Sequence, residues 1–320
     1  MLVNSRDGVT DPIVINKGVL QGETLSPLLF AIFIADLEEF LINKGIRGVS
    51  VNHLVEIVLL AYADDIVIFA DSYINMKKTI KALAEYCDIN KLEVNVKKTK
   101  VVLFQKGGHG HKRKHTPFYF KDQIIEYVCE YVYLGIIMAQ TAMYKKTADY
   151  IVKKAKAACT STISTIHKLK INSWNIYSKL FHTLVNATLM HGSEVYAINH
   201  LEELEKIQLT YFKRLLNLAQ NTPNYAVRLE TGKNHIALTI FEKVLNWIDK
   251  INNMPVERYP KIYFLRQLKI HKSNLGNKKY NWVSLICELF FKPLGIDSWL
   301  VNKEFAKIKI AIPWHPILRR

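Results

Sequence analysis

Two adjacent carboxylates, Asp64 and Asp65, lie between two short apolar runs, Ile57–Leu60 and Ile66–Ala70. Apolar runs separated by a polar insert of turn length predict a β-hairpin with both acids at its bend. Adjacent acids repel each other, and a buried hairpin tip gives neither an obvious partner, so the pair indicates a bound divalent cation. Asp-Asp is also an ordinary sequence for a solvated turn, and the spacing alone does not separate these two interpretations.

Three further motifs flank this pair in the chain. The first spans Gly18–Phe30, the second spans Leu92–Thr99, and the third is Tyr133-Leu134-Gly135. In this order the four segments resemble the second half of the palm of a reverse transcriptase, of the kind carried by non-LTR (LINE-like) retrotransposons. The resemblance covers residues from about 16 to 138.

A weaker resemblance continues beyond the palm. The segments Leu189–Tyr196, Leu204–Gln208 and Phe212–Leu216 are similar to the region that follows the palm in LINE-like enzymes. This region favours a retrotransposon over a group II intron maturase, whose palm motifs are similar.

The resemblance implies an α+β fold. We expect a partial polymerase palm, in which helices pack on an antiparallel sheet, followed by a mainly helical thumb and C-terminal region. The palm would occupy residues 1–140, the thumb-like region residues 141–220, and a helical or irregular region residues 221–320.

The activity that the resemblance implies is RNA-directed DNA polymerisation by two-metal nucleotidyl transfer, with Mg²⁺ or Mn²⁺ as cofactor. By this resemblance Asp64 is the principal metal ligand, and Asp65 is the adjoining acid with a supporting role. Lys98 matches a lysine that assists the leaving pyrophosphate. Because Lys97 and Lys100 stand beside it, the choice of Lys98 rests on the resemblance alone.

Other positions match binding elements of the family. The loop and helix start that lie against the templating pair and the incoming nucleotide correspond to Gln21, Gly22, Ser26 and Pro27, and the motif after the second palm helix contributes Asn95. We expect Gly22 to permit a close backbone approach that a Cβ would obstruct. The primer grip corresponds to Tyr133, Leu134 and Gly135.

The chain also departs from the family pattern. In the family the first catalytic aspartate, the gate that screens ribose from deoxyribose and the fingers all precede the Gln-Gly motif, and here only 20 residues precede Gln21. Asp7 and Asp11 stand in sequences typical of turns. We therefore expect a truncated element or an incomplete gene model that lacks a fingers or endonuclease segment and is inactive alone. The alternative is a non-catalytic remnant that only binds nucleic acid.

Charge is unevenly distributed along the chain. Residues 1–100 hold 11 Lys and Arg against 13 Asp and Glu, whereas residues 101–320 hold 33 against 15. Lysine and arginine bind nucleic acid by neutralising phosphates and releasing counterions. The basic part therefore predicts a polyanionic partner, and the resemblance names it as an RNA template with a DNA primer; a merely soluble basic surface is the alternative.

Apolar spacing predicts the helices of the first 140 residues. One helix is expected over Leu25–Leu41 and a second over Ile74–Ile89. Strands are expected over Val101–Phe104 and Tyr131–Ile137. The inward positions of the two helices are Leu29, Phe33, Leu37 and Leu41, and Ile80, Leu83, Ala84 and Cys87.

The remaining chain is mostly helical in pattern. A first helix places one apolar stripe opposite several lysines, and further helices are expected over Trp174–His191, Leu201–Leu218 and Ile236–Asn252. No clear period follows Pro255. The stripe consists of Ala148, Ile151, Ala155, Ala158, Thr162, Ile166 and Leu169.

Three smaller features of the sequence bear on the class of protein. The four cysteines, at positions 87, 129, 159 and 287, are too scattered for a zinc site and too few for a disulfide scaffold, so we expect reduced core thiols. The basic, glycine-rich segment 107–115 is expected to be a solvated loop. The longest apolar stretch, Leu28–Ala35, is too short for a membrane span, and no membrane partner is expected.

Overall fold

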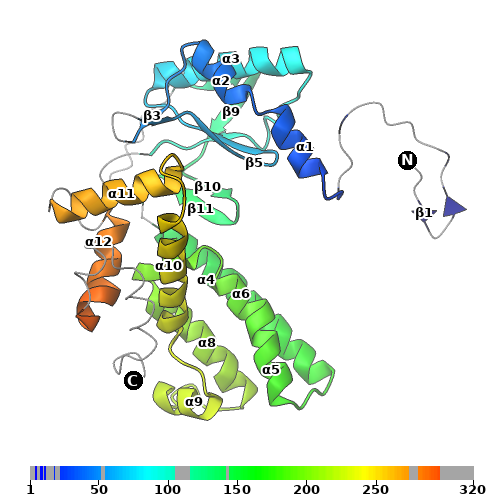
Figure 1. The fold of residues 1–320 in the computed structure, drawn as a ribbon. Coiled ribbons are helices and arrows are strands. Elements are labelled where there is room, and N and C mark those ends of the chain that lie inside the picture. Colours follow the sequence, from blue (N-terminus) through cyan, green and yellow to red (C-terminus); the bar gives the residue numbers. More distant parts are fainter. Residues whose placement is uncertain are drawn as a thin grey trace. The chain divides into compact units, whose positions relative to one another are not determined.

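The computed structural model describes residues 4–5, 8–9, 11, 18, 22–51, 55–104, 116–141, 144–273 and 280–295. The chain divides into two compact units, which are drawn in Figure 1. Unit 1 consists of residues 1–99 and 116–126, and unit 2 consists of residues 100–115 and 127–320. The fold mixes helices with small antiparallel sheets, so the predicted α+β class is confirmed.

The described part of unit 1 contains short strands and three helices. Its elements are β1 (Asn4–Ser5), β2 (Gly8–Val9), α1 (Ser26–Phe33), α2 (Leu37–Asn43), β3 (Val49–Ser50), β4 (Glu56–Ile57), β5 (Leu59–Tyr62), β6 (Asp65–Ile68), α3 (Tyr73–Asn90), β8 (Phe118–Phe120) and β9 (Gln123–Tyr127). The strands pair as antiparallel hairpins, β1 with β2, β3 with β4, β5 with β6, and β8 with β9.

The core of unit 1 forms where α2 and α3 pack against the β5–β6 hairpin. Its buried side chains are Leu37, Leu41, Ile46, Val58, Ala82 and Tyr86. Leu59 and Ile66, from the two strands of the hairpin, are partly buried against this core. The hairpin that carries Asp64 and Asp65 is therefore anchored by apolar contacts on its own strands.

The single helix predicted over Leu25–Leu41 is wrong, because turn residues 34–36 separate α1 from α2. Leu37 and Leu41 are buried as predicted, but Leu29 and Phe33 are 50% and 49% exposed. The buried side of α1 was predicted wrongly because the sequence of α1 is apolar on nearly every side. Such a run has no polar face to show which side is buried.

The second predicted helix is confirmed as α3. Ile80 and Cys87 are buried, and Leu83 and Ala84 are half-buried. The Ser72 hydroxyl caps the start of the helix by accepting a hydrogen bond from the Asn75 N–H at 3.2 Å.

Unit 2 begins with three strands and continues with helices. Its strands are β7 (Lys100–Val101), β10 (Glu130–Tyr133) and β11 (Ile136–Ala139), and its helices are α4 (Lys145–Lys168), α5 (Trp174–Leu180), η1 (Phe181–Asn186), α6 (Ala187–Leu189), α7 (Ser193–Tyr196), η2 (Ala197–Asn199), α8 (Leu201–Leu215), α9 (Asn224–Thr231), α10 (Ile236–Asn252), α11 (Tyr259–Lys272), α12 (Trp282–Ile286), η4 (Cys287–Phe291) and η5 (Lys292–Leu294). The longest of these helices are α4, α10 and α8 (Figure 1).

Both strand predictions need correction. The segment Tyr131–Ile137 is not one strand, because the chain reverses at Leu134 and Gly135 and forms the β10–β11 hairpin. Gly135 has a φ of 81°, which favours glycine and breaks the strand. The strand predicted over Val101–Phe104 is shortened to Lys100–Val101, and the β8–β9 hairpin was not predicted.

The predicted helices of unit 2 largely exist. In α4 every residue of the predicted stripe is buried or half-buried except Leu169, which follows the end of the helix and is 64% exposed. The helix predicted to reach His191 ends at Leu189 and contains the π-turn η1, and α8 ends at Leu215. Helix α10 has the predicted bounds, and the region after Pro255, which has no clear period, forms α11 and α12.

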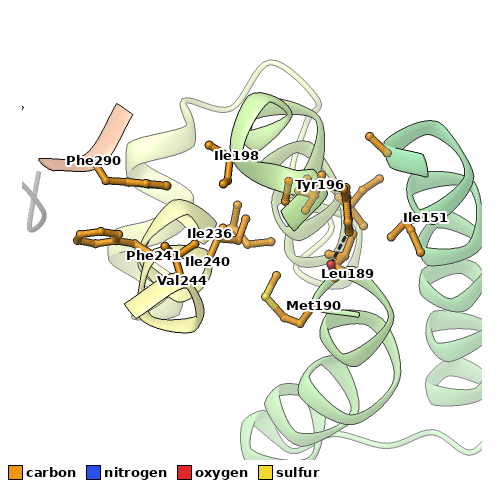
Figure 2. Packing of buried hydrophobic residues seen from close by; sticks show 14 of the residues in the cluster. Ile151, Leu189, Met190, Tyr196, Ile198, Ile236, Ile240, Phe241, Val244 and Phe290 are labelled. Carbon is orange, nitrogen blue, oxygen red and sulfur yellow. Dashed lines mark hydrogen bonds between the residues drawn. The ribbon is translucent and has the colours of Figure 1, made fainter. Parts of the chain in front are cut away.

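A single cluster forms the core of unit 2. Figure 2 shows part of it, from Ile151 of α4 on one side, through Tyr196 of α7, to Phe241 of α10, whose ring lies beside Phe290. Three of the four cysteines, Cys87, Cys159 and Cys287, are buried free thiols, whereas Cys129 is exposed and corrects the expectation of four core thiols. None of the described helices is long and apolar enough to cross a membrane. The segment 107–115 lies outside the described residues.

Candidate active site

The acidic pair lies at the tip of the β5–β6 hairpin. The register pairs Tyr62 with Asp65, so Ala63 and Asp64 form a two-residue loop and Asp65 begins β6. Ala63 has a φ of 51°, as the first residue of a loop must when its twist matches that of the flanking strands. The predicted hairpin with the acids at its bend is thus present.

Asp64 and Asp65 are both exposed, which corrects the expectation of a buried tip. Within the described parts of the chain neither carboxylate forms an ion pair or hydrogen bond with the protein. The described residues also contain no cluster of three His, Cys, Asp or Glu side chains that could hold a metal ion. The hairpin therefore presents two adjacent, unpartnered carboxylates to solvent, a donor set that suits a hard cation such as Mg²⁺.

A second hairpin of unit 1 has the same loop design. The β8–β9 loop consists of Lys121, with a φ of 53°, and Asp122, which is exposed. An aspartate at the second loop position therefore does not by itself distinguish the two hairpins. What distinguishes the β5–β6 tip is the adjacent second acid, Asp65.

The residues of the upstream motif lie at the start of α1. Ser26 is buried and is the first residue of the helix, and Pro27 occupies the first turn, where a missing N–H costs nothing. Gly22 has a φ of 94°, and no described atom lies within 4 Å of a Cβ built there. Within this chain, glycine is therefore favoured at position 22 by its positive φ and not by a neighbouring atom that a Cβ would meet. Gln21 and Asp7 lie outside the described residues, and Asp11 is exposed.

Asn95, Lys98 and Thr99 belong to one compact turn after α3. The Asn95 Oδ1 accepts a hydrogen bond from the Lys98 N–H at 3.1 Å, and the Asn95 carbonyl accepts the Thr99 hydroxyl at 3.0 Å. Val96 is buried and anchors the turn, whereas Lys97 and Lys98 are exposed. Within the described part of unit 1 no hydrogen bond or ion pair links this turn to Asp64 or Asp65.

The Tyr133-Leu134-Gly135 segment forms the tip of the β10–β11 hairpin in unit 2. Leu134 and Gly135 are the two loop residues, with φ values of 48° and 81°. The Leu134 carbonyl lies 2.9 Å from the Nε2 of His191. Sequence reasoning did not identify His191 as a contact of this turn, although the motif around it stood out.

The basic face of α4 contains two kinds of lysine. Lys145 and Lys146, at its start, are paired with Glu203 and Glu130, and the hydrogen bonds of Lys145 to Asp149 and Glu203 raise its pKa. Lys153, Lys156 and Lys168 are exposed, and none has an ion-pair partner among the residues that the structure describes. These three ammonium groups are free to contact phosphate.

Comparison with known proteins shows which family part of the chain is similar to. Residues 2–138 match the family model described as reverse transcriptase (RNA-dependent DNA polymerase). The match begins earlier than residue 16, where the resemblance was recognised in the sequence. The similar proteins come from non-LTR retrotransposons.

Two relatives illustrate this. The chain is 25% identical over 253 residues to a retrovirus-related Pol polyprotein from type-1 retrotransposable element R2 of Popillia japonica, which covers 76% of the chain and 34% of that protein. It is 24% identical over 215 residues to the RNA-directed DNA polymerase from mobile element jockey of Drosophila funebris, which covers 64% of the chain and 22% of that protein. The chain thus spans about a third or less of the length of these relatives. No solved structure matches it.

Proposed function

We propose that the chain supplies the metal-binding and primer-binding part of the RNA-directed DNA polymerase of a non-LTR retroelement. The observation that carries this proposal is the exposed, unpartnered Asp64–Asp65 pair at a hairpin tip within the residues that match the reverse transcriptase family model. Two like charges side by side with no protein cation are stabilised by a bound divalent metal.

Asp64 and Asp65 would hold Mg²⁺ or Mn²⁺, with Asp64 as the principal ligand. A bound metal would lower the pKa of the primer 3′-hydroxyl, so that this group loses its proton more readily, and would balance charge on the triphosphate and the leaving pyrophosphate. Asp65 increases the negative charge at the tip and so strengthens cation binding. Lys98 is exposed in the turn after α3. We assign to its ammonium group the role of neutralising negative charge on the leaving pyrophosphate.

Binding of the nucleotide and template is assigned to the start of α1 and the turn after α3. Gly22, Ser26 and Pro27 set the backbone at the helix start, with Gln21 beside them in sequence. Asn95 fixes its own turn through the hydrogen bond from the Lys98 N–H, which keeps the Lys98 backbone in one conformation.

The nucleic-acid partner is proposed to be an RNA template with a DNA primer. Tyr133, Leu134 and Gly135 form the proposed primer grip, and the free lysines of α4 bind the sugar–phosphate backbone. This corresponds to a palm over residues 1–140 and a thumb-like region over 141–220, followed by the C-terminal region 221–320. The charge distribution supports the assignment of primer and backbone binding to these residues, because the excess of Lys and Arg lies in residues 101–320.

Site-directed radical cleavage tests the metal site. Fe²⁺ replaces Mg²⁺ in the full chain bound to an RNA–DNA primer–template, and hydroxyl radicals generated with ascorbate and peroxide oxidise the polypeptide close to the bound ion. We expect oxidation to concentrate in residues 59–68 and to disappear when excess Mg²⁺ competes. The double variant Asp64→Asn/Asp65→Asn should lose the signal and still bind the primer–template.

Asp122→Asn is the matched control, because it removes a carboxylate from the equivalent loop position of the β8–β9 hairpin. It should leave oxidation at residues 59–68 unchanged. Oxidation that persists in the double variant, or that is equally strong at residues 121–122, would refute the metal assignment. Primer–template binding without localised oxidation would instead support the non-catalytic binding remnant.

A further inference from the structure

The segment Leu189–Tyr196 is the sequence motif to which the proposed function gives no role. In the structure its loop lies against the tip of the β10–β11 hairpin, 57 residues earlier in the chain. The His191 Nε2 and the Leu134 carbonyl oxygen are 2.9 Å apart. Because a carbonyl can only accept, the imidazole donates from Nε2, and this fixes the position of its proton.

Two glycines make this approach possible. A Cβ built on Gly135 would lie 2.9 Å from the His191 Nε2, and a Cβ built on Gly192 would lie 2.9 Å from the Cδ1 of Ile136. Both glycines also have positive φ, 81° and 66°. Each segment therefore has a glycine where a side chain of the other segment lies, and the two backbones are closer than other residues would allow.

The backbone conformation of Leu134 explains why this hydrogen bond is stabilising. Its φ of 48° lies in the left-handed region, which costs a residue with a Cβ about 1–2 kcal/mol. Two-residue loops with positive φ at both positions normally contain Asn-Gly or Asp-Gly. The leucine is therefore strained, and a hydrogen bond to its own carbonyl offsets that strain by fixing the Leu134–Gly135 peptide plane.

The loop that carries His191 is itself anchored. Lys243 of α10 donates to the Met190 carbonyl and lies 3.1 Å from Glu194 Oε2, and the Trp282 indole donates to the Glu194 carbonyl at 2.9 Å. Figure 2 shows Leu189, Met190 and Tyr196 packed between α4 and α10. The imidazole is thus presented from a rigid base.

We propose that His191 is the positioning residue of the Leu134–Gly135 turn. It holds the turn at the edge of a cavity of about 590 Å³, whose lining includes Lys154 of α4 and Thr188 of α6 as well as Leu134, Gly135 and His191. This inference rests on the proposed role of the turn in holding the primer. The consequence is that His191 determines where a bound primer strand lies without contacting the reacting atoms.

Hydrogen–deuterium exchange of the full chain without nucleic acid tests the inference directly. His191→Phe keeps a ring and removes the donor, whereas His191→Gln keeps an N–H donor of similar reach. We expect His191→Phe to raise exchange of the backbone amides in residues 130–139 about fivefold, which is the loss of one hydrogen bond, and His191→Gln to restore most of the protection. His167→Phe, which replaces an exposed histidine of α4, is the matched control and should have no effect.

Exchange of the α8 amides reports the stability of unit 2 as a whole. A variant that destabilises the whole unit would therefore raise exchange in α8 as well as in residues 130–139. Unchanged protection of residues 130–139 in His191→Phe, or equal loss in His191→Gln, overturns the inference. A second measurement needs no variant. In ¹⁵N-histidine spectra of the wild-type chain, we expect the signal of an Nε2–H group for His191. The Nδ1–H tautomer would overturn the inference.

A photocrosslink separates this inference from the proposed function. A primer with a photoreactive base at its 3′ end is crosslinked to the wild-type chain and to His191→Phe. Crosslinks at residues 133–135 that weaken at least fivefold in His191→Phe support both proposals. Crosslinks elsewhere in the wild type, with the exchange effect intact, refute only the primer-binding role. Crosslinks at residues 133–135 with no effect of His191→Phe on exchange refute only the positioning role.

Discussion

Tyr86 donates a hydrogen bond to Asp36 over 2.5 Å and thereby joins the C-terminal part of α3 to the N-cap of α2. The phenol ring is 1% exposed and meets Phe40 edge-on, with the ring centroids 5.3 Å apart. These residues belong to the core on which the β5–β6 hairpin packs. The pair therefore supports the element that carries Asp64 and Asp65.

This pair makes the stability of unit 1 sensitive to alkaline pH. Burial, together with the hydrogen bond to Asp36, raises the pKa of Tyr86 well above its ordinary value of 10.0. The unfolded chain loses this proton at a lower pH than the folded chain. The contribution of Tyr86 is therefore complete below pH 10 and is lost as the pH rises further, with a slope of about 1.4 kcal/mol per pH unit.

Urea unfolding of the wild type and Tyr86→Phe measures the effect. At pH 7 we expect the variant to be less stable by about 1 kcal/mol, the value of one hydrogen bond. Above pH 10 the stability of the variant should fall less steeply, because one proton fewer is released on unfolding. Parallel pH profiles for the two proteins would show that Tyr86 is not the titrating group.

A buried ion pair controls the stability of unit 2. Glu205 is 2% exposed; its Oε1 accepts from Arg228 at 3.1 Å and its Oε2 accepts from the Ile236 N–H at 2.8 Å. Arg228→Ala leaves a buried carboxylate without its cation and should cost about 3 kcal/mol in the free energy of unfolding. Adding Glu205→Gln should recover part of that loss, since the charge is removed while an oxygen still accepts from Ile236. A double variant less stable than Arg228→Ala alone would contradict this explanation.

The free and paired lysines of α4 should differ in nucleic-acid binding. A phosphate contact contributes about 0.7 to 0.9 to the slope of log affinity against log salt, so replacing Lys153, Lys156 and Lys168 by alanine should lower the slope by about 2. Replacing Lys145 and Lys146 should change it little, because carboxylates already neutralise them. Fluorescence anisotropy over a salt series measures both. An equal effect of the two sets would show that binding follows net charge rather than position.

Sequence patterns predicted α10 with its bounds because apolar residues recur at helical spacing along it, and Ile240, Val244, Ile248 and Ile251 are among those that are buried. They failed at α1, where the apolar run is continuous, and at the β10–β11 turn, where Leu134 adopts a conformation that leucine rarely adopts. Local signals describe a segment's own preference and not the tertiary contacts that override it.

The candidate site shows the same division. The position of Asp64 and Asp65 at a hairpin bend was predictable, because the flanking apolar runs determine it. Their exposure was not, since it depends on what packs around the tip. The contact of His191 with Leu134 joins residues 57 positions apart, and no local pattern predicts which backbone carbonyl a distant side chain will meet.

The two carboxylates at the β5–β6 hairpin tip should affect stability in opposite directions with and without metal. Without metal, Asp64 and Asp65 repel each other through water and have no partner in the described structure, so Asp64→Asn/Asp65→Asn should raise the free energy of unfolding slightly, by up to about 1 kcal/mol at low salt. With Mg²⁺ the order should reverse, because a cation bound only by the folded wild type adds stability that grows with its concentration. Thermal unfolding with a titration of MgCl₂ measures this, with Asp122→Asn as the control that keeps the wild-type Mg²⁺ response. A double variant that gains as much from Mg²⁺ as the wild type would place the cation elsewhere and remove the main support for catalysis at this tip.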